Sequence, residues 1–501
     1  MNAVLDGVTA LLDPTIGICL VIGILVGTLV GAVPGITATM AVALAAGFTL
    51  TLEPLQGLAV LLSIYIAAQF GDRVPAILIN TPGTPASIAT TFDGYPLAKQ
   101  GRAGIALTSS ALVSAVGALC GIAILLFFAQ PLASFALKFG PIEMFALVVF
   151  GLTMMIGVSG GKVLKGLTAG ALGLLLGTVG RDPITGDPRF TLGITELNSG
   201  LPFIAVIIGL FGIADVFNQM ITARRGKAPQ PITQLGEWWP NKSERKLLRK
   251  PTIIGTIVGA IVGVVPAAGG DIAGVVGWDQ ARRASKQSDT FGKGNLEGVA
   301  AADSASAATM GGSVTTTLAL GVPGDSVMAV MLGSMVIWGL QPGPALFVTQ
   351  PDLVFSLGTI MVIATLGALA LALVRMKGVV NLLALPPRYL AIIIVTFCMV
   401  GTYAVQNSIF DVVLMFAFGF IGLLMRRFGF PPGPMVLGLI LGPLAESNLR
   451  RALLIDGPAA VIHSPIASIL IVLSIVAVFA PRIVALIKKG RSRDVAESVT
   501  Q

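Results

Sequence analysis

Residues 320–326 read Leu320-Gly321-Val322-Pro323-Gly324-Asp325-Ser326, so a Pro-Gly turn interrupts an otherwise apolar run. A similar turn lies in Leu78-Ile79-Asn80-Thr81-Pro82-Gly83-Thr84-Pro85, and Pro82 and Pro323 are 241 residues apart. Two further breaks occur in Val33-Pro34-Gly35-Ile36-Thr37 and in Val265-Pro266-Ala267-Ala268-Gly269-Gly270-Asp271, where Pro34 and Pro266 are 232 residues apart. Interrupted hydrophobic segments at corresponding positions of two halves indicate the binding site of a secondary transporter.

The composition is that of a membrane protein. Of the 501 residues, 55% are hydrophobic and 11% are charged, whereas a soluble domain usually carries about 25% charged residues. Apolar runs close to the ~20 residues that cross a hydrocarbon core as a helix are 16–33, 104–129, 201–220, 353–374 and 459–480. With the shorter runs included, we expect roughly 10–14 membrane segments, some of them re-entrant. The sequence therefore predicts an all-α polytopic membrane protein with two repeated halves, interrupted helices and re-entrant hairpins.

The formal net charge is +8, and many of the basic residues lie in two regions. Basic residues crowd one central loop and follow the last apolar run: Arg224, Arg225, Lys227, Lys242, Arg245, Lys246, Arg249, Lys250, Arg482, Lys488, Lys489, Arg491 and Arg493. Basic clusters next to membrane segments indicate cytoplasmic loops. A nucleic-acid-binding tail is disfavoured because neither aromatic interleaving nor a soluble fold accompanies these charges.

These charges suggest boundaries and a topology. We predict a first transmembrane repeat over 1–221, a cytoplasmic basic linker over 222–251, a second repeat over 252–457, and a C-terminal helix with a basic tail over 458–501. Trp238 and Trp239 suit an amphipathic segment at the headgroup level, although a solvated linker explains them equally well. Residues before Ile16 carry acids but no Lys or Arg, so the two halves would enter the membrane from opposite sides as an inverted repeat. Arg450 and Arg451 do not fit this topology simply.

The interrupted segments predict a ligand site. Inside a bilayer, an extended turn leaves backbone groups unpaired unless protein or a water-filled cavity surrounds it. Exposed amides and helix N-termini attract anions, and free carbonyls coordinate cations. The candidate substrate-binding residues are Pro34, Gly35, Thr37, Arg73, Asn80, Thr81, Pro82, Gly83, Thr84, Ser87, Gly269, Gly270, Ser306, Pro323, Gly324 and Ser326. Small-residue helix packing is the alternative, but packing alone does not require Pro-Gly pairs at corresponding positions.

Charged residues within these segments are candidate functional groups, because ionisable side chains at membrane depth are costly. The candidates for ion coupling are Asp72, Asp271, Asp303 and Asp325. Arg73 could clamp a substrate carboxylate with its planar fork, or Asp72 and Arg73 could neutralise each other structurally. We expect the turns at 82–87 and 323–326 to lie close together near the bilayer midplane, facing one cavity and starting half-helices.

Other chemistry finds little support. Cys19, Cys120 and Cys398 lie within apolar runs and are interpreted as packing residues, and the single histidine, His463, cannot form a multi-histidine metal site. No H-E-x-x-H pair or phosphate-binding loop occurs. We therefore expect no enzyme activity, no metal site and no cofactor beyond a coupling Na⁺ or H⁺. An ion or solute channel is a further alternative, and an intramembrane enzyme is the weakest.

The order of motifs resembles the large permease subunit of the tripartite tricarboxylate transporters, the TctA family, along nearly the whole chain. In the first half the matching motifs are Gly31-Ala32-Val33-Pro34-Gly35, Ile79 to Ser87, and Asp93-Gly94-Tyr95-Pro96 continuing to Gly104. In the second half they are Gly269-Gly270-Asp271-Ile272-Ala273, Phe291-Gly292-Lys293-Gly294, Glu297 to Ala301, and Gly339-Leu340-Gln341-Pro342-Gly343-Pro344.

This resemblance implies a multi-pass permease of the bacterial inner (cytoplasmic) membrane. It implies two partners, a small membrane subunit and a periplasmic solute-binding protein, and import of a carboxylate driven by an ion gradient. The chain departs from the common family pattern at Asp72-Arg73 (usually Gly-Ser), Asp303 (Glu), Ser306-Ala307 (an Asn pair), Asp325 (a small residue) and Trp338 (His). The implied substrate class is therefore a tricarboxylate or a related organic acid.

Overall fold

A computed structural model describes residues 13–33, 36–158, 163–182, 185–223, 232, 234–266, 269–382, 387–457 and 460–476. The chain forms two compact units. Unit 1 comprises 1–137 and 202–424, and unit 2 comprises 138–201 and 425–501. Unit 1 thus combines parts of both predicted halves, and the two units are considered separately below.

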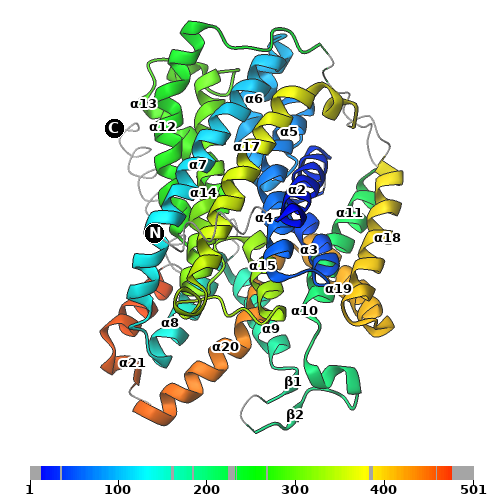
Figure 1. The fold of residues 1–501 in the computed structure, drawn as a ribbon, viewed down its shortest axis with the longest axis vertical. Coiled ribbons are helices and arrows are strands. Elements are labelled where there is room, and N and C mark those ends of the chain that lie inside the picture. Colours follow the sequence, from blue (N-terminus) through cyan, green and yellow to red (C-terminus); the bar gives the residue numbers. More distant parts are fainter. Residues whose placement is uncertain are drawn as a thin grey trace, which may run out of the picture. The chain divides into compact units, whose positions relative to one another are not determined.

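Unit 1 is built from helices, several of them short or interrupted (Figure 1). Its first part contains α2 (Pro14–Ala32), α3 (Ala38–Thr49), α4 (Pro54–Gly71), α5 (Arg73–Ile79), η2 (Pro85–Ser87), α6 (Ile88–Lys99) and α7 (Ala103–Ala136). After residue 202 come α10 (Phe203–Ile207), the π-helix η4 (Ile208–Ile213), α11 (Ala214–Ala223), α12 (Lys242–Val264), α13 (Gly269–Ala284), η5 (Ser288–Thr290) and α14 (Leu296–Leu320). The last elements are α15 (Ser326–Ile337), α16 (Leu346–Thr349), α17 (Pro351–Leu382), α18 (Pro387–Gln406) and α19 (Ile409–Phe428), whose final residues enter unit 2.

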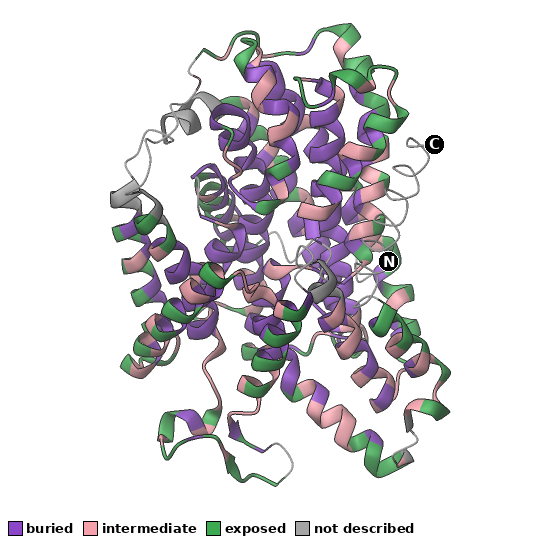
Figure 2. Cartoon of the chain, turned by 180° about the vertical axis from the view of Figure 1, so that it is seen from behind, coloured by how far each residue is buried: buried purple, intermediate pink, exposed green. Residues whose placement is uncertain are grey.

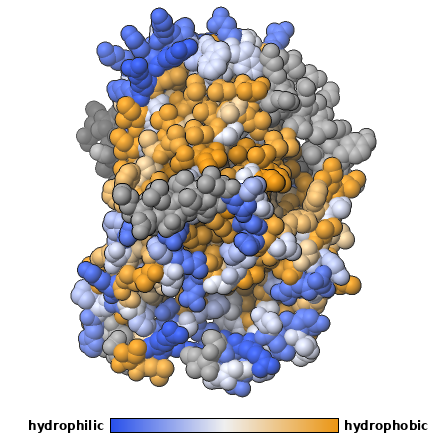
Figure 3. All heavy atoms as spheres, in the orientation of Figure 1, coloured by the Kyte–Doolittle hydropathy of each residue, from blue (hydrophilic) through white to orange (hydrophobic). Residues whose placement is uncertain are grey.

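Six helices of the described chain are long and apolar enough to cross a membrane. They are Pro14–Ala32, Pro54–Ile79, Ala103–Ala136, Lys242–Val264, Pro351–Val374 and Ile409–Phe428, and seven shorter apolar helices accompany them. Figure 3 shows apolar side chains over the flank of the molecule and hydrophilic ones gathered at the upper end, where α12 and α13 lie. The prediction of an all-α polytopic membrane protein is therefore confirmed.

The same glycine spacing packs the first pair of helices in each half. Gly23, Gly27 and Gly31 of α2 lie against α4, and Gly255, Gly259 and Gly263 of α12 lie against α14. Each glycine of one set is 232 residues from its counterpart, the offset that also separates Pro34 from Pro266. A Cβ at Gly27 would lie 2.6 Å from the Ile64 carbonyl oxygen, and one at Gly263 would lie 2.7 Å from that of Thr309. Small residues of this kind let membrane helices approach until their backbones touch.

Residue contacts give the direction of these helices. Successive glycines of α2 contact successively later residues of α4, and successive glycines of α12 contact successively later residues of α14. The two helices of each pair therefore run parallel. In contrast, Tyr65 contacts Asp325 while Arg73 contacts Ser306 and Asp303, so α4 runs antiparallel to α14. The two repeats are therefore inverted, as expected from the charges.

The halves also exchange packing partners. The α7 helix packs on α14 of the other half, and α17 packs on α4; likewise α3 packs on α15, and α13 packs on α6. Figure 2 shows buried residues concentrated on the inner helices and exposed ones on outer helices and loops. Because α4 and α14 lie between these partners, nearly all their residues are buried, and this is where the charged residues of both halves meet.

Unit 2 consists of α8 (Pro141–Val158), α9 (Val163–Gly177), β1 (Gly180–Arg181), β2 (Pro188–Arg189), η3 (Thr195–Ser199), α20 (Pro432–Asp456), α21 (Ala460–His463) and a helix over Pro465–Val476. The strands form an antiparallel hairpin in which Gly180 pairs with Arg189. Both α8 and α9 pack on α20. A small core of Ile142, Ala146, Ala452 and Ala467 joins α8, α20 and the last helix.

An ion-pair network ties the hairpin of unit 2 to α20. Arg189 forms a bidentate pair with Glu446, with distances of 2.7 and 3.1 Å, and lies 3.2 Å from Asp182. Arg450, which did not fit the simple topology, lies 3.0 Å from Asp182 and 2.6 Å from Glu446. The hydrogen bonds from Arg189 hold the pKa of Glu446, which lies outside the six candidate spans, below its ordinary value of 4.5.

We expect Arg189→Gln and Glu446→Gln each to lower the apparent melting temperature of the purified protein, by the equivalent of about 1 kcal/mol for a partly exposed pair. The double variant should lose less than the sum of the two single variants, because each single variant already removes the Arg189–Glu446 interaction. A lowered folded-state pKa means that this stabilisation is present above pH 4.5 and disappears as the pH falls below it. If the losses of melting temperature in the two single variants simply add in the double variant at neutral pH, Arg189 and Glu446 do not stabilise the protein through a shared interaction.

Candidate functional site

The two Pro-Gly turns, at Pro82 and at Pro323, are formed by the same series of backbone features. The α5 helix ends at Asn80 with φ 55°, and α14 ends at Gly321 with φ 70°, which is the left-handed conformation that closes many helices. Asn80 and Gly321 are 241 residues apart, as are Pro82 and Pro323, and each proline stops the helix from resuming. The sequence therefore sets both breaks at equivalent places.

A glycine follows each proline because the turn packs tightly against its own helix. A Cβ at Gly83 would lie 2.8 Å from the Asp72 Cβ, and one at Gly324 would lie 2.7 Å from the Ser313 Cβ. Asp72 and Ser313 are again 241 residues apart. After the glycine, η2 leads into α6, and α15 begins at Ser326 behind the N-cap Asp325. Each turn therefore starts a new short helix, as predicted.

The start of α13 lies between the two turns. A Cβ at Gly270 would be 3.3 Å from the Ala86 Cβ and 2.9 Å from the Ser306 hydroxyl, and one at Gly269 would be 3.9 Å from the Asp325 Cβ. These contacts put Ala86 and Asp325 within about 14 Å of each other, since adjacent Cα atoms are about 3.8 Å apart. The turns are close together, and the absence of side chains at the two glycines lets the start of α13 pack against both of them.

A buried charged cluster, consisting of Asp72, Arg73 and Asp303, lies beside the first turn. The side chains of these three residues are at most 3% exposed. Arg73 Nη1 donates to Asp72 Oδ1 at 2.5 Å, and Arg73 Nε lies 3.7 Å from Asp303 Oδ1. The cluster thus joins the hinge between α4 and α5 to the middle of α14, on the other half of the repeat.

Hydroxyl groups surround this buried charged cluster. Thr84 donates to Asp72 Oδ2, and Thr90 donates to Asp303 Oδ1. Ser306 accepts from Arg73 Nη2 at 3.4 Å, and the Ser110 hydroxyl lies beside Asp303. Five elements therefore contribute: the α4–α5 hinge, the first turn, α6, α7 and α14.

The second turn, at Pro323, has a related arrangement in which the carboxylate and the hydroxyl have exchanged places. Asp325 on this turn accepts hydrogen bonds from the Tyr65 hydroxyl and from the Met328 amide at 2.8 Å, while Ser313 lies on the helix beside it. In the first half the acid is on the helix, at Asp72, and the hydroxyl is on the turn, at Thr84. The first turn is therefore held to a helix of its own half through Asp72, whereas the second is held through Asp325 to Tyr65 of α4, in the other half.

The structure places the remaining predicted residues around these two turns. Thr37 caps α3 by accepting from the Met40 amide at 3.2 Å, Thr39 pairs with Ser326 at 2.8 Å, and Ser87 donates to the Thr84 carbonyl at 3.0 Å. Asp271 lies near Gly269 at the start of α13. Asn80 is exposed, and Thr81 and Pro82 are partly so. Pro34 and Gly35 lie outside the described residues.

Sequence reasoning missed three groups at this site: Tyr65, Thr90 and Ser110. Their side chains reach residues more than 190 positions away, so no local motif marks them. The 241-residue offset between the halves indicates one of these groups, because it makes Tyr65 equivalent to Ser306, which was a predicted site residue.

A further buried carboxylate, that of Asp93, forms a clamp at one end of unit 1. Its Oδ1 accepts from the backbone amides of Gly292, Gly294 and Asn295 at 2.8, 3.0 and 2.8 Å. Its Oδ2 accepts from the Trp278 indole at 2.7 Å. The clamp joins α6 of the first half to α13 and to the loop before α14 in the second half.

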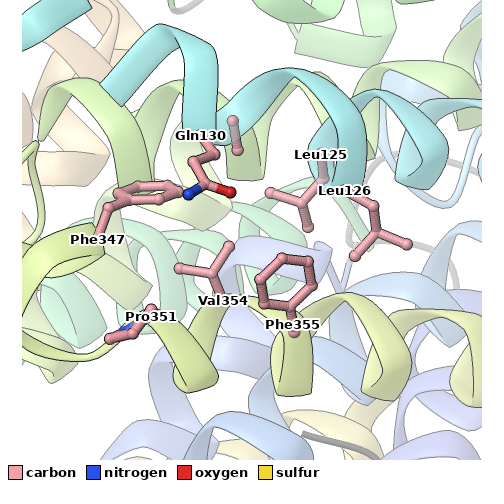
Figure 4. Close-up of a pocket in the computed structure, with 8 residues that line it drawn as sticks. Leu125, Leu126, Gln130, Phe347, Pro351, Val354 and Phe355 are labelled. Atoms are coloured by element: carbon pink, nitrogen blue, oxygen red, sulfur yellow. The ribbon is translucent and has the colours of Figure 1, made fainter. Parts of the chain in front are cut away.

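An apolar pocket lies away from the turns, between α7 and the start of α17 (Figure 4). It is lined by Leu125, Leu126, Ala129, Gln130, Phe347, Pro351, Val354 and Phe355. None of these was a predicted site residue, and none of them is charged.

Comparison with known proteins gives both a family and relatives. A family model described as "Tripartite tricarboxylate transporter TctA family" matches residues 18–437. An uncharacterized 52.8 kDa protein in the TAR-I ttuC' 3'region of Agrobacterium vitis is 39% identical over 487 residues, covering 97% of this chain and 96% of the relative. An uncharacterized protein in the TAR-II ttuC' 3'region of the same organism is 36% identical over 232 residues, covering 46% of this chain and 94% of the relative. No solved structure matches the chain.

Proposed function

The chain belongs to the tripartite tricarboxylate transporter TctA family, and we propose that it is the large permease subunit that imports a carboxylate, using a Na⁺ or H⁺ gradient. Its membership and its apolar helices make it a multi-pass membrane component of a tricarboxylate transporter. The direction, the energy source and the location in the bacterial inner membrane are parts of the proposal.

One observation carries this proposal: two inverted, interrupted helices meet at a site that contains buried charge. Asp72 and Arg73 at the α4–α5 hinge contact Asp303 in α14 of the other half. In secondary transporters, substrate and coupling ions bind where inverted repeats meet, on interrupted helices. A movement of one repeat against the other would expose this site to opposite sides in turn.

The chemistry of the turns suits a carboxylate. The first turn of α6 presents backbone amides, which attract anions, whereas the carboxylate of Asp325 already caps α15. Gly269 and Gly270 bring the start of α13 close to both Pro-Gly turns, and Asn80, Thr81 and Pro82 remain accessible at the edge. We place the substrate against these turns.

The tripartite family name supports two partner subunits. In the proposed system, a periplasmic solute-binding protein delivers the carboxylate and a small membrane subunit accompanies this chain. A channel would not need inverted repeats around buried, paired charges. Family membership favours a transporter over an enzyme.

The test is uptake of radiolabelled citrate and dicarboxylates into right-side-out vesicles that contain all three subunits. With the binding protein supplied outside, an imposed Na⁺ or H⁺ gradient should drive accumulation without ATP. Collapsing both gradients should reduce the accumulation to the level of vesicles that lack this chain. Uptake that survives this collapse and needs ATP would overturn the proposal.

A further inference from the structure

The buried charged cluster is not electrically neutral. It contains two carboxylates, Asp72 and Asp303, and one guanidinium, Arg73, all nearly inaccessible to water. With every group ionised, its net charge is therefore −1. An uncompensated charge in a low-dielectric interior is strongly unfavourable, so the cluster requires one more positive charge.

Two of the three nitrogens of the Arg73 guanidinium donate to neighbouring groups. Its Nη1 donates to the Gln69 carbonyl and to Asp72, and its Nη2 donates to Ser306. Its Nε makes no hydrogen bond among the described residues but faces Asp303 Oδ1 at 3.7 Å. A bidentate clamp on a substrate carboxylate needs two free N–H groups on one edge. This arrangement therefore favours a cluster that attracts a cation over one that binds the anionic substrate.

One oxygen of the cluster remains open. Both oxygens of Asp72 accept hydrogen bonds, from Arg73 and Thr84, and Asp303 Oδ1 accepts from Thr90. Asp303 Oδ2 is buried and has no hydrogen-bond donor within the described part of the chain. The Ser110 hydroxyl, on a residue that is 1% exposed, lies beside this carboxylate and interacts with it.

We propose that this open position is the site of a coupling proton, which binds Asp303 Oδ2 and makes the cluster neutral. The assignment rests on the proposed function, because it names the coupling ion of that transporter. The proton adds to the carboxylate from one side of the membrane, and its release to the other side regenerates the carboxylate. No other bond changes.

A proton fits this position better than Na⁺. A metal cation needs several oxygen ligands around it, whereas three of the four carboxylate oxygens here are occupied. It would also lie next to the guanidinium of Arg73, which is 3.7 Å from Asp303 Oδ1. A proton needs only one oxygen, and two carboxylates that share a site commonly hold one.

The groups that face Asp303 come from four elements: Arg73 and Asp72 at the hinge, Thr90 of α6, Ser110 of α7 and Ser306 of α14. The other acids of the site, Asp271 and Asp325, lie at the second turn with Tyr65. Arg73 is therefore the positively charged group that competes with the proton for Asp303.

The first experiment is infrared difference spectroscopy of the purified protein between alkaline and acidic pH. A protonated-carboxyl band should appear on acidification, persist in Asp303→Glu and be lost in Asp303→Asn. Asp411→Asn, which removes a buried carboxylate elsewhere in unit 1, is the matched control and should keep the band. A Na⁺ jump at fixed pH should leave the wild-type spectrum unchanged. A band that survives Asp303→Asn, or one that responds to Na⁺, would overturn the proposal.

The second experiment uses the three-subunit vesicles with a radiolabelled carboxylate that the wild type accumulates. Asp303→Asn should lower the accumulation ratio to about 1, the equilibrium value without coupling, while carboxylate exchange persists. The Asp303→Glu variant should retain accumulation. Normal proton-driven accumulation by Asp303→Asn would refute the proton site alone. Absence of gradient-driven uptake in the wild type would instead refute the proposed function.

Discussion

Replacing Arg73 by serine is expected to cause the largest loss of folded protein of any single change at the site. The variant leaves Asp72 and Asp303 buried without their shared cation, so the charge of the cluster changes from −1 to −2. Breaking a buried ion pair by removing one partner typically costs about 3–5 kcal/mol. We expect little monodisperse protein in size-exclusion chromatography and a strongly lowered melting temperature.

The matched control removes both members of the adjacent pair. The double variant Asp72→Gly with Arg73→Ser returns the charge of the cluster to −1, because only Asp303 remains, and it also restores the residues common in the family. Its yield and melting temperature should recover most of the loss. If the double variant is as unstable as Arg73→Ser alone, Arg73 acts through contacts other than its pairing with Asp72.

Arg73→Lys separates charge from geometry. A lysine keeps the positive charge but cannot donate at once to the Gln69 carbonyl, to Asp72 and to Ser306 in the planar arrangement of the guanidinium. Protein amount should therefore lie between the wild type and Arg73→Ser. A selective loss of apparent substrate affinity at normal stability would instead indicate that Arg73 contacts the substrate.

The sequence predicted the architecture because the decisive signals were local or periodic. Apolar runs gave the helices, Pro-Gly pairs gave the breaks, and constant offsets gave the repeat. The turn at Pro323 illustrates this: the left-handed Gly321, the helix-stopping proline and the close approach of Gly324 all follow from residue type.

The partners of the charged groups could not be predicted in the same way. Asp303 meets Thr90 at a separation of 213 residues, and Tyr65 meets Asp325 at a separation of 260. These contacts depend on how the inverted halves cross, which only the packing of helices from one half against helices of the other determines. The alternative that Asp72 pairs with Arg73 was visible because the residues are adjacent, but Asp303 as their third member was not.

The position of Asp93 shows the same limit. Its motif was noticed as part of the family resemblance, but its function as a clamp was not predicted. A carboxylate that accepts three backbone amides holds a loop of glycines in one conformation, and those amides come from residues about 200 positions later in the chain. The sequence shows the glycines, whereas only the fold shows what they surround.

Asp93→Ala is expected to release this clamp. It leaves the amides of Gly292, Gly294 and Asn295, as well as the Trp278 indole, without their acceptor. Each buried group left unsatisfied costs about 1–3 kcal/mol, and partial hydration of the loop would reduce the total to about 3 kcal/mol. The melting temperature should fall, and limited proteolysis should cut within 285–295 where the wild type resists.

Asp93→Asn is the graded control, because its carbonyl oxygen can still accept the three amides while its NH₂ group faces the indole N–H, another donor. Its loop should remain protected from protease, with a smaller loss of stability. Gly298→Ala tests the same contact from the other side, since a Cβ at Gly298 would collide with Asp93 Oδ2. If Asp93→Ala leaves the loop protected, the packing of Trp278 between Phe92 and Phe291, rather than the carboxylate, holds the halves together at this end.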